Sequence, residues 1–178
     1  MMADPVATPD DLRDNAAFEA LMWAMARPGT LHDLPEGLTD LVLALVDREC
    51  RVLVDDPALA QVVAATGAAL VAAPAADHAF LTRVDSAMAV LAALPAGSPL
   101  YADQGATLVL PALLGQGQRL RLTGPGIEGA IETAVGGLPD GFIALRAARC
   151  RYPEGVEMVF VDGSRIMALP RSTTVEGM

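Results

Sequence analysis

The sequence predicts an α/β domain, a three-layer αβα sandwich with a mixed sheet. Helical and strand-like segments alternate along the chain, and residues 106–110 are nearly all apolar, as in a strand buried on both faces. Two apolar segments flank Asp162-Gly163-Ser164, a spacing typical of an antiparallel hairpin. The chain has 178 residues, 53% of them hydrophobic, so we expect one domain over 1–178, with 1–14 as a tail.

The first helix is predicted over 15–26. Phe18, Leu21, Met22 and Met25 follow an i, i+3, i+4, i+7 spacing, which indicates one apolar stripe facing the core. Local caps, proline and glycine bound the other helices. These are predicted over 38–46, 57–66, 86–94 and 139–150.

The strands are predicted from short apolar or alternating segments between turn residues. Residues 156–161 and 165–169 form the hairpin, so part of the sheet must be antiparallel. The remaining strands are predicted over 51–54, 70–72, 78–81, 106–110, 119–122 and 131–135.

Charge and composition exclude several classes of function. The net charge of −10 would repel nucleic acid and anionic membrane surfaces on average, so we expect neither as a partner. All twelve basic residues are arginine. Without lysine the chain cannot hold pyridoxal phosphate as an internal aldimine, and we expect no cofactor.

The few cysteines and histidines predict no metal site. Cys50 and Cys150 lie far apart and cannot by themselves ligate a four-iron cluster. His32 and His78 have no partner at zinc-ligand spacing. The acidic first residues lack the pattern of a signal peptide, and no segment is apolar enough for a membrane span, so we expect a cytoplasmic protein.

Two polar segments are candidate ligand-binding sites. In Thr123-Gly124-Pro125-Gly126 the glycines permit backbone N–H groups to converge on an anion, but Pro125 lacks one donor and the segment also suits an ordinary turn. Arg171, Ser172 and Thr173 offer a guanidinium and hydroxyls suited to phosphate oxygens, although they also suit a polar segment leaving the last strand.

Other singled-out residues predict structural roles or an interface. Trp23 lies off the stripe of the first helix, and tryptophan is enriched at subunit interfaces, so we expect Trp23 at one and the isolated chain to form a homodimer. Asp77 and His78 are neighbours on a strand and point to opposite faces, so they do not form an acid–base dyad. We therefore identify no catalytic residue.

Four segments taken together resemble the H-subunit family (PhnH) of the bacterial carbon–phosphorus lyase system. They read FEALMWAMARPG at 18–29, GATLVL at 105–110, LRLTGPGI at 120–127 and LPRSTTVE at 169–176. Their order and spacing, with the hairpin before the last segment, extend the resemblance from about Asn15 to Glu176.

The resemblance implies a fold similar to the large domain of pyridoxal-phosphate-dependent transferases, without the cofactor. It also implies a core complex with G, I and J subunits, in which ATP and a phosphonate give a ribose 1-phosphonate 5-triphosphate. The family's nucleosidase chemistry is ascribed to the I subunit and the radical cleavage to the iron–sulfur J subunit. The chain is therefore expected to be an accessory subunit that is not catalytic alone.

Two other functions fit the residues alone. One is an enzyme for a small phosphorylated ligand, held by the 123–126 and 171–173 segments, although no nucleophile–base pair is recognisable. The other is a stand-alone homodimeric binding protein. A neighbouring gene cluster that encodes the G, I and J subunits would favour the accessory role. Turnover by the isolated chain would favour the enzyme.

Overall fold

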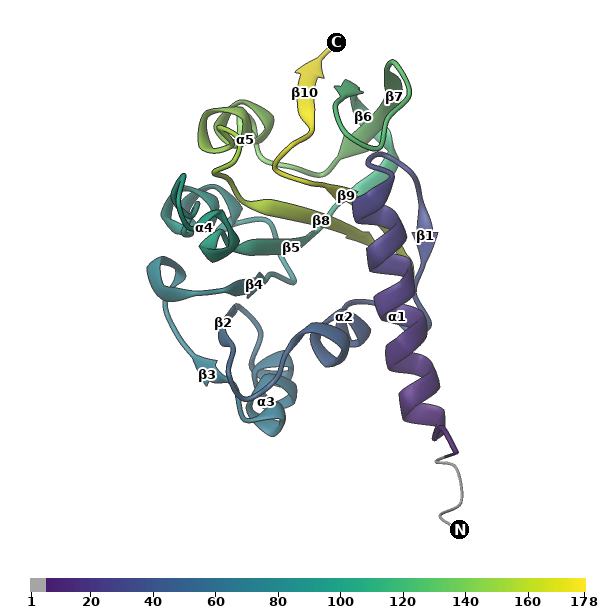
Figure 1. Ribbon diagram of the computed structural model, residues 1–178, viewed down its shortest axis with the longest axis vertical. Helices are drawn as coiled ribbons and strands as arrows, with labels where there is room; N and C mark the ends of the chain where they lie inside the picture. The colour runs from purple at the N-terminus through teal and green to yellow at the C-terminus, as the bar shows by residue number, and fades with distance from the viewer. Residues whose placement is uncertain (1–5) are drawn as a thin grey trace.

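The computed structural model describes residues 6–178 and contains a seven-stranded and a three-stranded sheet (Figure 1). The helices are α1 (Pro9–Ala26), α2 (Leu38–Leu45), α3 (Pro57–Thr66), α4 (Ala87–Ala93) and α5 (Phe142–Arg149). The strands are β1 (His32–Asp33), β2 (Arg51–Val54), β3 (Ala69–Leu70), β4 (His78–Phe80), β5 (Thr107–Pro111), β6 (Leu113–Thr123), β7 (Ile131–Gly136), β8 (Glu157–Asp162), β9 (Arg165–Leu169) and β10 (Thr174–Gly177). Two short 3-10 helices span Ala73–Ala75 and Ala102–Gln104.

The large sheet is mixed, as predicted. Its strand order is β1-β9-β8-β5-β4-β2-β3. The neighbouring pairs β3–β2, β2–β4, β4–β5 and β5–β8 are parallel, whereas β8–β9 and β9–β1 are antiparallel. The predicted hairpin around Asp162-Gly163-Ser164 is confirmed as β8–β9.

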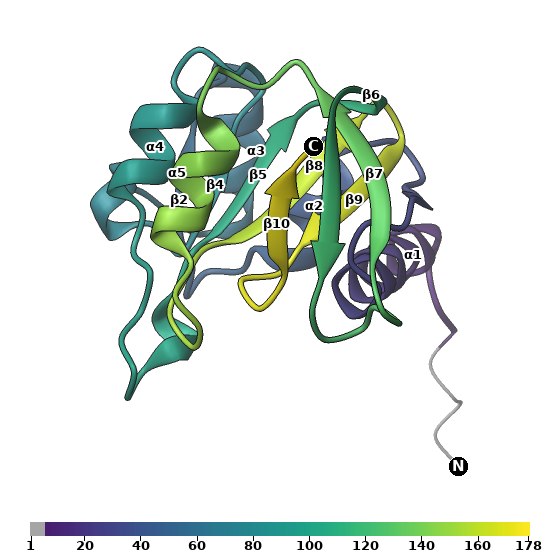
Figure 2. The same cartoon turned by 90° about the horizontal axis from the view of Figure 1, so that it is seen from above.

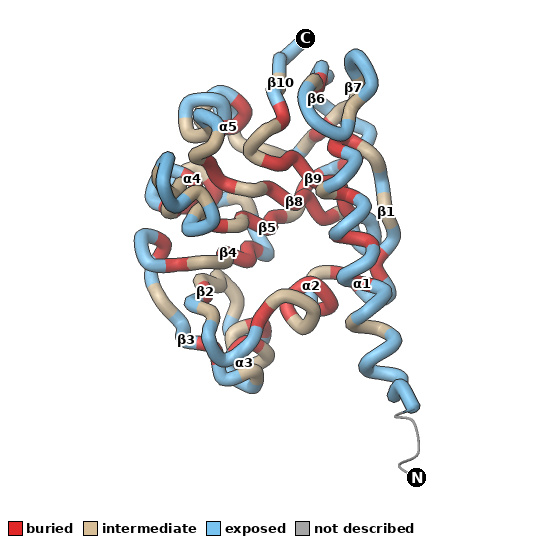
Figure 3. Tube along the Cα trace, in the orientation of Figure 1, coloured by how far each residue is buried: buried red, intermediate tan, exposed pale blue. Residues whose placement is uncertain are grey.

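Alternating side chains of the central strands pack on opposite faces of this sheet. On one face, Val109 and Val159 pack with helices α1, α2 and α3. On the other face, Leu108 and Phe160 pack with α4, α5 and the three-stranded sheet β10-β6-β7. Figure 2 shows this second outer layer, and Figure 3 shows buried residues along β5, β8 and β9. The molecule therefore has three layers, but one outer layer is part helix and part sheet.

The first helix differs from its prediction in length and in its buried face. It begins at Pro9, not Asn15, because Thr8 and Asp11 form a capping box that stabilises an earlier start. Residues 9–14, predicted as tail, are thus helical, and residues 1–5 of that tail lie outside the described residues.

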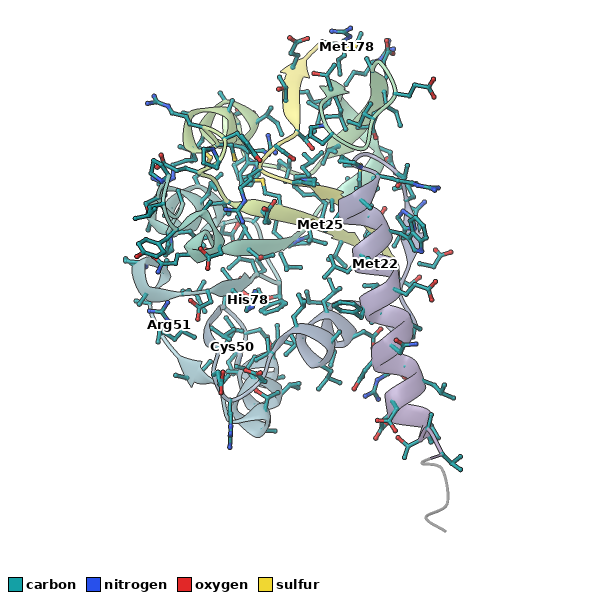
Figure 4. All side chains as sticks on the ribbon, in the orientation of Figure 1. Met22, Met25, Cys50, Arg51, His78 and Met178 are labelled. Carbon is teal, nitrogen blue, oxygen red and sulfur yellow. The ribbon has the colours of Figure 1, made fainter. Side chains whose placement is uncertain are left out.

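The predicted apolar stripe of α1 is only partly correct. The buried residues are Leu21 and three alanines, which let the helix lie close to the sheet. Phe18 and Met22 are 51% and 46% exposed, and Met25 is half-buried (Figure 4). The hydrophobic spacing predicts that the larger side chains face the core. In the structure the smaller ones face it, because they allow close packing.

The small sheet was only partly predicted. Strand β6 runs over eleven residues, although alternation indicated only 119–122. Its first half contains Gly115 and Gly117 around a register shift between Leu114 and Gln118, which removes the regular pattern. The sequence predicts no strand after residue 169, whereas β10 forms there and pairs antiparallel with β6.

The other boundaries lie close to the predicted ones. Helix α3 and strands β2 and β9 begin and end where the sequence indicated. Helix α5 begins at Phe142, three residues after the predicted Pro139, because Pro139 to Gly141 form a turn before it. Among residues 6–178, no helix is both long and apolar enough to cross a membrane.

Candidate functional site

The segment 170–174, named here the 170–174 loop, leads from β9 to the first residue of β10 at a place where distant segments meet. The N–H of Gly29, just after α1, donates to the carbonyl of Ala168 at 3.3 Å. Thr174 pairs in register with Thr123, at the end of β6. The chain thus brings the end of α1, the turn after β6 and the start of β10 together beside this loop.

Arg171 fixes the first half of the loop through one carboxylate. Its backbone N–H donates to Glu157 Oε2 at 2.6 Å, and its guanidinium Nε donates to Glu157 Oε1. Its Nη1 donates to the carbonyl of Ala102, next to the 105–110 segment. Arg171 therefore connects this loop with β8 and with the approach to β5.

A second guanidinium, that of Arg146 on α5, lies beneath the loop. Arg146 is 1% exposed and donates to three backbone carbonyls, those of Leu169, Pro170 and Thr173, at 3.3, 2.6 and 3.0 Å. Within residues 6–178 no carboxylate forms a salt bridge with it. Burial lowers the pKa of Arg146, and the nearby Cys150 and Glu157 act in the opposite direction. Arginine still stays charged at neutral pH, so this is a buried cation held by carbonyl dipoles.

A cavity of about 180 Å³ lies between α5, the loop and β10. Arg146, Arg171, Ser172 and Thr173 are among the side chains that line it. Thr173 is 2% exposed, and its Oγ1 has no hydrogen-bond partner within residues 6–178. The Nε of Arg146 is likewise buried without a partner there. The cavity is therefore lined by two cationic side chains, and two of its lining residues each have one buried polar atom without a hydrogen-bond partner.

The structure places the predicted ligand residues in two groups. Arg171, Ser172 and Thr173 line the cavity, whereas the 123–126 segment does not. That segment is a turn closed by a hydrogen bond from the N–H of Ile127 to the carbonyl of Gly124 at 3.2 Å. Its predicted role in binding an anion stays a prediction.

Two glycines of this turn allow the neighbouring segments to approach closely. Gly126 has φ +81° and lies so near the Ala26 carbonyl that a β-carbon would overlap it. A β-carbon on Gly124 would lie 2.8 Å from the Ser172 carbonyl oxygen. The turn thus supports both the end of α1 and the loop that lines the cavity.

Arg146 is the site residue that the sequence reasoning missed. Helix α5 buries Phe142 and Ile143, and Arg146 follows at the i+4 and i+3 positions of the same face. An arginine at a core position of an amphipathic helix is a signal that could have identified it, because arginine is rarely fully buried without a specific partner.

The Asp77–His78 pair does not act as a dyad. Asp77 accepts from the guanidinium and from the backbone N–H of Arg51, which lowers the pKa of the Asp77 carboxyl. His78 lies half-buried on β4 (Figure 4), and burial lowers the pKa of its imidazole despite the opposing charge of Asp77. The two side chains thus have separate surroundings, as the strand geometry predicted.

Trp23 lies on the outer surface of α1. It is 38% exposed, and the guanidinium carbon of Arg27 lies 4.6 Å from the centre of its ring. Phe18 and Met22 are exposed on the same helix. The three side chains do not form one face of α1, because Trp23 lies off the stripe that contains Phe18 and Met22.

The fold and site define a mixed α/β domain with a basic, hydroxyl-lined cavity beside its C-terminal strand. The family model for bacterial phosphonate metabolism protein (PhnH) matches residues 8–176, so the chain belongs to this family.

Two curated relatives agree with this family. A protein of Stutzerimonas stutzeri, whose name assigns it provisionally as the C-P lyase subunit HtxG, is 31% identical over 92% of this chain and 86% of its own length. The alpha-D-ribose 1-methylphosphonate 5-triphosphate synthase subunit PhnH of Rhizobium meliloti (strain 1021) is 30% identical over 98% of this chain and 93% of its own. The family resemblance read from the four sequence segments is confirmed.

Proposed function

We propose that this chain is an accessory subunit of the carbon–phosphorus lyase core complex in alkylphosphonate catabolism. It supports formation of ribose 1-phosphonate 5-triphosphate from ATP and a phosphonate, and it is not catalytic alone. The observation that carries this proposal is the family match over residues 8–176. The Rhizobium meliloti relative, named as a subunit of the corresponding synthase, supports the same reaction.

The surroundings of the titratable groups support an accessory role. Displacing adenine from ATP needs an acid for the leaving base and cations placed around three phosphates. The carboxylates of Asp77 and Glu157 are engaged by arginines. Within residues 6–178 neither carboxylate forms a hydrogen bond with His78. A reaction centre shared with other subunits would supply the missing groups.

The proposed partners are the G, I and J subunits of the core complex, and a second copy of this chain when it is isolated. Trp23 supports the second contact, because this exposed side chain would lose water on pairing. The proposal also places the protein in the cytoplasm and likens its fold to the large domain of pyridoxal-phosphate-dependent transferases, without the cofactor. The seven-stranded mixed sheet is compatible with that likeness.

The ligand-facing part of this subunit is proposed to be Arg171, Ser172 and Thr173. Their support is their position around one cavity. Thr123, Gly124 and Gly126 have a supporting role in this proposal, since they hold the turn against the same loop.

Co-expression with the G, I and J subunits tests the proposal. A tag on the I subunit should retain this chain in stoichiometric amount through size-exclusion chromatography, whereas an unrelated α/β protein of similar size should be lost. Failure of the chain to co-purify would contradict the accessory role. Turnover of ATP with a phosphonate by the isolated chain would favour an independent enzyme instead.

A further inference from the structure

We propose that the cavity between α5 and the 170–174 loop is a binding site for a tetrahedral phosphorus oxyanion, a phosphate or phosphonate group. This rests on the proposed function for the choice of phosphorus as the central atom, whereas the charge argument depends on the structure alone. The site is formed by this chain, so the isolated protein should bind the anion.

The charge balance at the cavity favours an anion. Arg146 and Arg171 both line it, and Glu157 is the one carboxylate among residues 6–178 that forms a salt bridge with either guanidinium. That carboxylate is used by the backbone N–H and Nε of Arg171. One positive charge therefore remains without a counter-ion in a chain whose net charge is −10. A buried cation in this position gains most from an added anion, because the surrounding dielectric is low.

Two residues that line the cavity carry buried polar atoms of a kind that suits an oxyanion. Nε of Arg146 and Oγ1 of Thr173 are both buried without a hydrogen-bond partner within residues 6–178. A buried polar atom without a partner is costly, and a bound ion or water is one explanation for such an atom. A guanidinium and a hydroxyl are both donors that phosphate oxygens accept from. The hydroxyl of Ser172, also on the cavity wall, adds a further donor.

The size and position of the cavity are compatible with a phosphoryl or phosphonyl group. Its volume of about 180 Å³ is several times the roughly 30 Å³ that one water molecule occupies in the liquid. It lies near the start of β8 and the end of β9, because Arg171 and Arg146 in its wall donate to Glu157 and to the carbonyl of Leu169. Ligands of parallel sheets usually bind at the carboxyl ends of the strands, the edge of the sheet opposite this cavity. At that edge Asp55 accepts from the N–H and hydroxyl of Thr82, and its negative charge disfavours an anion.

Calorimetric titration of the isolated full-length chain tests the proposal. The probes are methylphosphonate, inorganic phosphate and tripolyphosphate, with chloride at matched ionic strength as the reference. We expect saturable binding of at least one phosphorus oxyanion, and the preferred probe distinguishes a phosphonyl group from a polyphosphate chain. Thermal unfolding should shift upward with the same probe, since a ligand that binds only the folded state stabilises it.

Two variants separate an anion site from a structural clamp. Thr173→Val removes the unpartnered hydroxyl with little change of shape, so it should leave the unliganded fold as stable as before. It should lower the affinity for the anion about tenfold. Arg171→Gln should weaken it at least as much. The matched controls Thr133→Val and Arg119→Gln remove a hydroxyl and a charge outside the cavity and should bind as the natural chain does.

The outcomes are decisive in both directions. Saturable binding that is lost in Thr173→Val and kept in Thr133→Val supports the site. Absence of saturable binding for all three probes, or equal affinity of Thr173→Val and the natural chain, overturns it. This titration uses the chain alone, so its failure is distinct from a failure to co-purify with the G, I and J subunits.

Discussion

Replacing Arg146 with methionine should lower the free energy of unfolding by about 3 kcal/mol. The guanidinium donates to three backbone carbonyls, and a buried hydrogen bond contributes about 1 kcal/mol net. Methionine keeps an unbranched apolar chain in the same space, so the cavity left behind is small. Removing a buried charge is favourable and partly offsets the loss of the three hydrogen bonds. The substitution leaves no carboxylate unpaired, so the three carbonyls that lose their donor determine that the free energy of unfolding falls.

Urea unfolding followed by far-ultraviolet circular dichroism measures this difference by linear extrapolation. The matched control is Arg149→Met on the same helix, because Arg149 is half-buried and donates to one carbonyl, that of Leu94. The control should lose about 1 kcal/mol or less. Equal losses for the two variants, or a loss below about 1 kcal/mol for Arg146→Met, would refute the idea that the carbonyl contacts hold the 170–174 loop.

Three further substitutions test the supports of the fold. Asp40→Ala should cost about 2 kcal/mol in urea unfolding, since Asp40 is buried and accepts from the N–H groups of Glu36 and Gly37; an unchanged midpoint would contradict this. Gly126→Ala should lower the melting temperature, because of its positive φ and the Ala26 carbonyl; a rise would show that the turn is not tightly held. Burial lowers the folded-state pKa of His78, so stability should fall as pH drops below about 6.5, by at most about 1.4 kcal/mol per pH unit. In His78→Gln that slope should flatten, and an identical slope in both proteins would refute the assignment.

Local patterns predicted much of the large sheet. Short apolar segments that end at proline, glycine or aspartate gave β2, α3 and β9 their correct bounds. These elements agree because propensity, turn chemistry and burial all favour the same structure there. The hairpin of β8 and β9 was also predictable, because the two strands are adjacent in sequence.

Long-range packing determined what the sequence pattern missed. Strand β10 has mixed polarity and forms because β6 offers a partner about fifty residues earlier, and strand propensity depends on such neighbours. In α1, the alanines fit against the sheet, which left Phe18 and Met22 outside. Neither result follows from spacing within the segment itself.

Only part of the candidate site could be predicted, again because some of its contacts join distant parts of the chain. Arg171, Ser172 and Thr173 were singled out by their adjacent donors, and they do lie around one cavity. Arg146 comes from a helix in a different part of the chain and reaches the loop only through the tertiary fold. The sequence indicated the chemistry of the loop, whereas the buried charge beneath it required the structure.

The most direct test of the account is product formation by the reconstituted core complex. The G, I and J subunits are supplied with ATP and methylphosphonate, with and without this chain, and phosphorus NMR follows the ribose 1-methylphosphonate 5-triphosphate. The account predicts product only when the chain is present, none from the chain alone, and reduced product with Arg171→Ala. Full product formation by a complex that lacks the chain would contradict the accessory role.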